Sequence, residues 1–143
     1  MKEMIRVEFD GYWLERYQAE IPQRAGIYCV YACESVAKDK IVVLRELLYI
    51  GESDDVREAI AGAEDAAVWK ERLHEGEELC YSVASVEREV RGIAWEAMVS
   101  HHRPPCNRMI HKRAADISLT IVGEHELLDD FIAGVNEQTM LDD

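Results

Sequence analysis

Short apolar runs separated by polar, glycine-containing segments make up most of the chain, and several of these runs alternate with a period of two. Such alternation is typical of a β-strand that buries one face. The expected strands are residues 4–13, 26–32, 41–50, 79–86 and 117–123. We expect the first of them, which ends near the turn signal Asp10-Gly11, at an edge of the sheet.

A different spacing, typical of helices, marks residues 85–102. Apolar positions recur there at i, i+3, i+4 and i+7, which places them on one face of a helix. The residues of this stripe, extended to i+11, are Val90, Ile93, Ala94, Ala97 and His101. Pro104 ends the helix, since the residue before a proline avoids helical geometry. Shorter helices are expected at residues 54–63 and 124–134.

This mixture of strands and helices predicts an α/β (α+β) fold, with a small central antiparallel sheet of three to four strands flanked by helices. The 143 residues suit a single domain spanning 1–143. No apolar run approaches the ~20 residues of a membrane span, and the start lacks the pattern of a signal peptide. The four cysteines have no metal-site spacing and are expected to be reduced thiols. We therefore expect a cytoplasmic protein with no membrane partner.

The net charge of −13 opposes a general affinity for nucleic acid. The charge is unevenly distributed, because residues 101–113 (the basic stretch) contain no acidic residue and include Arg103, Arg108, Lys112 and Arg113. Such a local concentration of cations fits contact with phosphate groups. The alternative is a solvated charged loop, with His101 and His102 at the surface beside a helix end.

Two of the expected strands combine a tyrosine with a glycine, in Gly26-Ile27-Tyr28 and in Tyr49-Ile50-Gly51. Strands joined by a connection of this length usually pair antiparallel. Tyr28 and Tyr49 would then point into one shallow pocket. Taken singly, each tyrosine is equally an ordinary strand aromatic.

Two further pieces follow in the chain: Glu96 within the predicted helix, and Pro104-Pro105-Cys106-Asn107 after it. Together with the two tripeptides, they resemble the ordered motifs of the GIY-YIG nuclease superfamily. The resemblance covers residues 26–107 and leaves residues 108–143 as a C-terminal extension of the same domain. It implies metal-assisted hydrolysis of phosphodiester bonds in nucleic acid, with DNA as the expected substrate.

The resemblance also assigns roles to individual residues. Glu96 would bind a divalent metal, magnesium or manganese, while Tyr28 or Tyr49 would position or deprotonate the attacking water. A single carboxylate holds magnesium weakly, with several waters retained. The other candidates are Arg57, Arg103 and Arg108 for substrate binding, and Gly26, Gly51 and Asn107 as structural residues of the site.

The chain departs from the family pattern on the helix that follows Gly51. The family places an arginine eight residues after this glycine and often a histidine four further on, where this chain has Ala59 and Ala63. Arg57 is two residues from Ala59, a rotation of roughly 200° around a helix, so it should point away.

Three explanations of this departure stay open. The chain is a catalytically inactive domain that binds nucleic acid or protein, the −13 charge favouring a basic protein. Alternatively, Arg72, His74 or the basic stretch supplies the missing charge, or the sequence is an engineered inactive variant.

Overall fold

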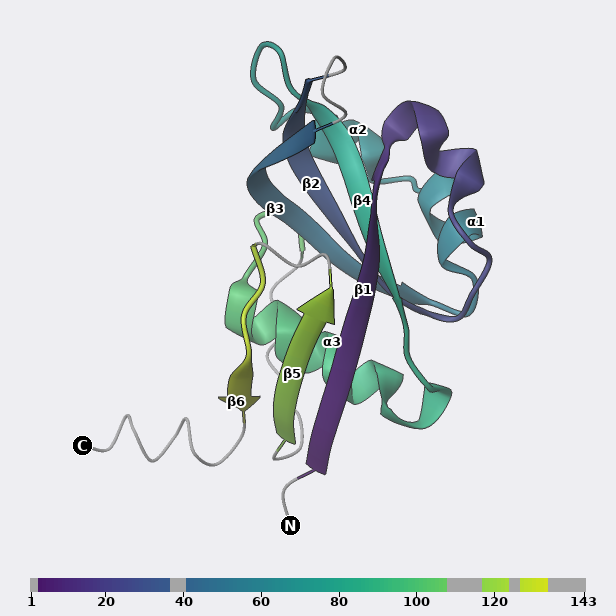
Figure 1. Cartoon of the computed structure of the whole chain (residues 1–143), viewed down its shortest axis with the longest axis vertical. Coiled ribbons are helices and arrows are strands. Elements are labelled where there is room, and N and C mark those ends of the chain that lie inside the picture. The colour runs from purple at the N-terminus through teal and green to yellow at the C-terminus, as the bar shows by residue number, and fades with distance from the viewer. Residues whose placement is uncertain (1–2, 37–40, 108–116, 124–126, 134–143) are drawn as a thin grey trace, which may run out of the picture.

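The computed structural model describes residues 3–36, 41–107, 117–123 and 127–133. These residues form six strands and four helices, one of them a 3-10 helix (Figure 1). In chain order they are β1 (Glu3–Leu14), the 3-10 helix η1 (Glu15–Glu20), β2 (Gly26–Val36), β3 (Ile41–Ser53), α1 (Val56–Ala61), α2 (Ala66–Lys70), β4 (Glu78–Ser85), α3 (Arg88–His102), β5 (Ile117–Gly123) and β6 (Phe131–Ala133). In this part of the chain, no helix is both long and apolar enough to cross a membrane.

The strands of the described residues form one six-stranded sheet in the order β3-β2-β4-β1-β5-β6. Neighbouring strands are antiparallel except for β1 and β5, which run parallel. The expected α+β class is therefore correct, but the expected sheet of three to four antiparallel strands is too small. The expected sheet corresponds to β3, β2, β4 and β1. The observed sheet continues from β1 with β5 and β6.

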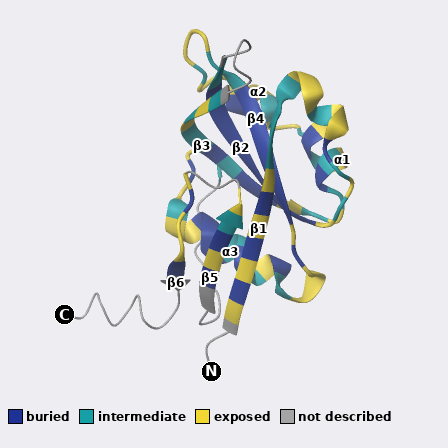
Figure 2. Ribbon diagram, viewed as in Figure 1, coloured by how far each residue is buried: buried dark blue, intermediate teal, exposed yellow. Residues whose placement is uncertain are grey.

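β1 is an inner strand, so its predicted edge position is wrong. The reason is a partner distant in the sequence: Glu3 to Phe9 pair in register with Ile117 to Gly123. The predicted alternation along β1 is observed, because Ile5, Val7 and Phe9 are buried between exposed residues. Figure 2 shows this pattern as bands along β1.

The sheet buries apolar residues on both faces, as the alternation along β2 shows. One face forms the α3-side core, which includes Ile27, Cys29, Tyr31 and Cys33 of β2 with Ala94, Ala97, Met98 and Val99 of α3. The other face forms the α1-side core, which includes Tyr28, Val30 and Ala32 of β2 with Ile21, Val56, Ile60 and Trp69. β4 lies between the two cores and is buried at six consecutive positions, Leu79 to Ala84 (Figure 2).

The helix predicted for residues 124–134 is wrong where the structure describes it. Phe131–Ala133 forms strand β6, which pairs with β5 through Leu119 and Phe131, while residues 124–126 lie outside the described residues. Leu127, Leu128 and Phe131 do follow helical spacing, but pairing with the edge of β5 overrides this local preference. The helix after Gly51 is also shorter than predicted, and Asp55 caps it by accepting a hydrogen bond from Glu58 N at 3.0 Å.

Candidate active site

Tyr28 and Tyr49 lie side by side on the α1-side face of the sheet. They come from the paired strands β2 and β3, and their ring centroids are 6.0 Å apart. Tyr49 also packs against Trp69, with a centroid distance of 5.3 Å. Tyr28 is only 6% exposed, whereas Tyr49 is partly open to solvent. The two tyrosine rings therefore form one aromatic cluster with Trp69 of α2 on this face of the sheet.

Both glycines of the tripeptides have a steric reason to be glycine. The Tyr28 ring lies across Gly51, where a Cβ would stand 2.6 Å from Tyr28 Cε1 and nearer still to Cζ and Oη. A Cβ on Gly26 would stand 2.8 Å from the Ala84 carbonyl carbon and nearer still to its oxygen. Only glycine permits such close approaches without moving the neighbouring strand or ring.

Asn107 joins the segment after α3 to strand β3, next to Tyr49. Its Oδ1 accepts a hydrogen bond from Ile50 N, and its Nδ2 donates one to Ile50 O, both at 2.8 Å. Trp95 Nε1 donates to the same Ile50 carbonyl at 2.8 Å. The Asn107 side chain therefore holds the segment after α3 against β3 through hydrogen bonds to the Ile50 backbone. The resemblance implies a structural role of this kind.

Glu96 lies on α3, and the structure does not join it to the phenols. The buried apolar residues of α3 belong to the α3-side core, on the face of the sheet opposite Tyr28. The Glu96 side chain is half-buried, and no hydrogen bond or ion pair within the described residues involves its carboxylate. The one described group of three possible metal ligands also excludes it.

The predicted cations are likewise engaged elsewhere. Arg57 donates from Nη1 to Ala19 O of η1 at 3.3 Å, so it turns away from the phenols. Arg72 pairs with Glu46, and His74 pairs with Glu77. Arg103 is exposed and donates to Ser100 O, while Arg108 and the rest of the basic stretch beyond Asn107 lie outside the described residues. Ala59 and Ala63 instead pack at the border of the α1-side core.

The electrostatic surroundings of the two phenols are acidic. Burial, followed by the neighbouring Tyr49 hydroxyl and the charges of Asp65 and Glu52, raises the pKa of Tyr28 well above its usual range. Burial and then Asp65 also raise the pKa of Tyr49. Both phenols therefore stay protonated at neutral pH, and nearby carboxylates oppose the approach of a phosphate anion.

Sequence analysis did not anticipate Arg91, which is the buried cation of this region. Its guanidinium donates from Nε to Glu52 Oε1 and from Nη2 to Asp54 Oδ1, both at 2.8 Å. Arg91 is 8% exposed, and its buried Nη1 has no hydrogen-bond partner in the structure. The sequence gives no signal that Arg91 is buried and ion-paired. Its partners, Glu52 and Asp54, follow the second tyrosine tripeptide and are distant from Arg91 in the chain.

Comparison of the chain with family models, with curated proteins and with solved structures found no significant match. The likeness to GIY-YIG nucleases thus depends on the motif residues and their arrangement.

Proposed function

We propose that this chain is a nuclease-like domain of GIY-YIG type that acts by binding a basic protein segment, not by cleaving nucleic acid. The observation that carries the proposal is that, among the residues the structure describes, no cation contacts the phenol pair. Within the described residues, no arginine, lysine or histidine is bonded to Tyr28 or Tyr49, and Arg57 is turned toward Ala19. Phosphoryl transfer depends on such charges to stabilise the transition state.

Three contacts support the family-level part of the proposal. Gly51 leaves space for the Tyr28 ring, and Gly26 leaves space for the Ala84 carbonyl. The Asn107 side chain makes two hydrogen bonds to the Ile50 backbone. Each of these three residues thus has a physical task around the two tyrosine strands. Chance identity of single letters would not be expected to produce three such fits around one strand pair.

The choice of a basic partner follows from the charge around the phenols. Asp65 is exposed and has no ion pair among the described residues. Glu52 and Asp54 are exposed too, although each is paired with Arg91. The chain as a whole carries −13. A surface potential of this sign attracts lysine-rich and arginine-rich segments and repels nucleic acid. The four cysteines are free thiols, three of them buried, which supports a reducing, cytoplasmic setting.

Binding and cleavage can be tested separately. In fluorescence anisotropy at low salt, a labelled Lys/Arg-rich peptide should bind, and binding should weaken as salt screens the charges. Glu52→Gln combined with Asp65→Asn should weaken peptide binding, whereas Glu89→Gln on the exposed side of α3 should not. Tight binding of DNA or RNA with no binding of the peptide would contradict the proposal.

A second candidate function is slow metal-dependent cleavage, favoured by the tyrosine pair itself. Tyr28, Tyr49 and Glu96 with Mg²⁺ or Mn²⁺ would be its minimum machinery, and loss of the arginine alone would slow the reaction ~10²–10³-fold. Nicking of plasmid DNA that requires the metal and disappears in both Glu96→Ala and Tyr28→Phe, but not in Glu89→Ala, would establish it. Activity that appears only in Ala59→Arg would show that the cation alone was missing.

A further inference from the structure

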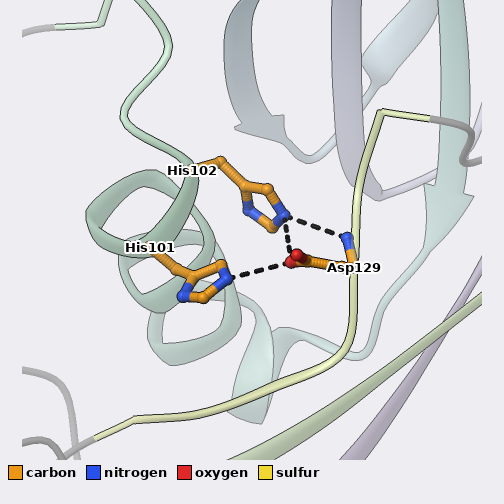
Figure 3. A group of neighbouring side chains, drawn as sticks. All are labelled: His101, His102 and Asp129. Atoms are coloured by element: carbon orange, nitrogen blue, oxygen red, sulfur yellow. Dashed lines mark hydrogen bonds and ion pairs between the residues drawn. The ribbon is translucent and has the colours of Figure 1, made fainter.

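Two consecutive histidines at the end of α3 and one aspartate before β6 bring three possible ligand atoms together (Figure 3). His101 Nε2 lies 2.9 Å from Asp129 Oδ1, and His102 Nε2 lies 3.2 Å from the same oxygen. The three ligand atoms all lie within 4.8 Å of one another. We call these residues the His-His-Asp cluster. Asp129 lies 28 positions after His101 and 27 positions after His102, so the fold is what brings the three residues together.

Hydrogen bonding fixes the tautomer of His102. Its Nδ1 lies 3.1 Å from the Met98 carbonyl oxygen, and because a carbonyl only accepts, Nδ1 must carry the proton. Nε2 then presents a lone pair toward Asp129, whose backbone N–H donates to it at 3.2 Å. Metal-binding histidines commonly donate their second N–H to a backbone carbonyl in this way.

The remaining contact in the cluster calls for a cation. A lone pair on His102 Nε2 and a carboxylate oxygen of Asp129 are both electron-rich, and they face each other at 3.2 Å. The Asp129 N–H donates to this lone pair, and a proton or a metal ion close to both atoms would relieve the repulsion further. The fold therefore holds two acceptors in the arrangement that a bound cation would stabilise.

Packing positions both imidazoles before any ion arrives. The His101 ring stacks on Phe131 with centroids 4.1 Å apart and planes 5° apart, and the His102 ring meets Phe131 edge-on at 5.6 Å. The His102 side chain is only 8% exposed. Because Phe131 belongs to the α3-side core, the rings cannot move freely, and little ordering would remain to be done on binding.

We propose that the His-His-Asp cluster binds a divalent transition-metal ion, Zn²⁺ first among them, through Nε2 of His101, Nε2 of His102 and the carboxylate of Asp129. Zinc binds imidazole nitrogen and carboxylate oxygen at about 2.0–2.2 Å in a tetrahedron, which puts neighbouring ligand atoms about 3.3 Å apart. The two Asp129 contacts are already close to that spacing. Imidazole ligands favour zinc over magnesium, which prefers oxygen.

Three protein ligands leave the fourth zinc position for a water molecule. Solvent can reach the cluster from the side of Asp129, whose side chain is 71% exposed. The ion would also tie the end of α3 to the segment leading into β6. This site is separate from Glu96 and is independent of the proposed function.

The test uses the untagged full-length chain, freed of metal with a chelator and titrated with Zn²⁺ by calorimetry. One zinc per chain should bind, and Co²⁺ should give the visible absorption of a four-coordinate site without a thiolate charge-transfer band. Asp129→Asn and His101→Ala should each lower zinc affinity at least ~tenfold. His74→Ala is the matched control, since His74 is 83% exposed and pairs only with Glu77; its affinity should equal that of the wild type.

Folding of the variants is checked separately, by thermal unfolding in chelator. Asp129→Asn keeps the size of an exposed side chain, so it should unfold like the wild type without metal and should lose only the stabilisation that zinc adds. The proposal is overturned if the wild type binds no zinc at micromolar concentration, which would leave only the hydrogen bonds between the imidazoles and Asp129. It is equally overturned if Asp129→Asn and His101→Ala bind zinc as tightly as the wild type.

Discussion

At the scale of single residues, Gly51 is a position where one methyl group has no room. In Gly51→Ala the new Cβ would overlap the Tyr28 ring, which is itself held between Tyr49 and the α1-side core. Forcing extra volume into a packed site costs about 1–3 kcal/mol. We expect chemical denaturation to show a loss of stability in this range, and Tyr28→Ala in the same chain should recover part of it.

Gly92 supplies the matched control for this prediction. It is exposed on α3, and a Cβ there would meet nothing within 4 Å. Gly92→Ala should therefore stabilise the protein by about 0.5–1 kcal/mol through helix propensity. If both substitutions had the same effect, the contact between Tyr28 and Gly51 would have no energetic significance.

Asn107 makes a second prediction at this scale. Asn107→Ala removes both hydrogen bonds to Ile50 and leaves Ile50 N without a partner, while Ile50 O keeps the bond from Trp95. An unsatisfied buried donor costs about 1–3 kcal/mol. Asn107→Asp preserves the acceptor for Ile50 N, so it should unfold at a higher denaturant concentration than Asn107→Ala. The reverse order would show that the donated bond to Ile50 O is the more important one.

At the scale of elements, the Arg91 side chain connects α3 to the end of β3. The hydrogen bond from Arg91, with the charges of Arg88 and Arg91, lowers the pKa of Asp54 in the folded protein. A carboxyl whose folded pKa is depressed stabilises the protein above its unfolded pKa of about 3.9, and this contribution is lost as pH falls through the folded pKa.

Arg91→Met should therefore reduce stability most at neutral pH, and the difference from the wild type should shrink as the pH falls below about 4. Denaturation curves measured for both proteins between neutral and acid pH check this. The low pKa of Glu77 contributes equally to both proteins and cancels. Arg88→Met should show a smaller pH-dependent difference, because Arg88 is mostly exposed and lies 3.9 Å from Asp54. A difference that stays constant with pH would argue against the ion pair.

The same two elements show what the sequence could predict. Strand β2 and strand β3 follow from alternation and from the two tripeptides, because both signals are local. The rotation of α3 was predicted only in part: Ala94 and Ala97 are buried as expected, but so are Arg91, Met98 and Val99. Arginine does not count as apolar in a periodicity, and its burial depends on Glu52 and Asp54, which only the fold brings near. The direction of Glu96 relative to the phenols depended on this unpredicted packing.

At the scale of the whole molecule, the parallel pairing of β1 with β5 was out of reach of local patterns. The sequence shows that residues 117–123 alternate, but not where that strand joins the sheet. The His-His-Asp cluster depends on the same long-range step, since β6 must pair with β5 before Asp129 can reach α3. The motif region therefore does not determine the architecture without the strands that follow it.

Removing those strands gives the last prediction: a chain ending at Asn107 should not fold cooperatively. It would lose four buried side chains of the α3-side core, Leu119, Ile121, Leu128 and Phe131. Burial of such residues contributes about 1.5–3 kcal/mol each, so the loss approaches the about 5–15 kcal/mol by which a typical domain is stable. It would also leave residues 3–8 of β1 without a partner strand and expose Ile5 and Val7. Circular dichroism melting checks this, with a chain ending at Ala133 as the control that keeps every described strand. A cooperative transition at the full-length temperature in the shorter chain would mean that residues 3–107 form a complete core without β5 and β6.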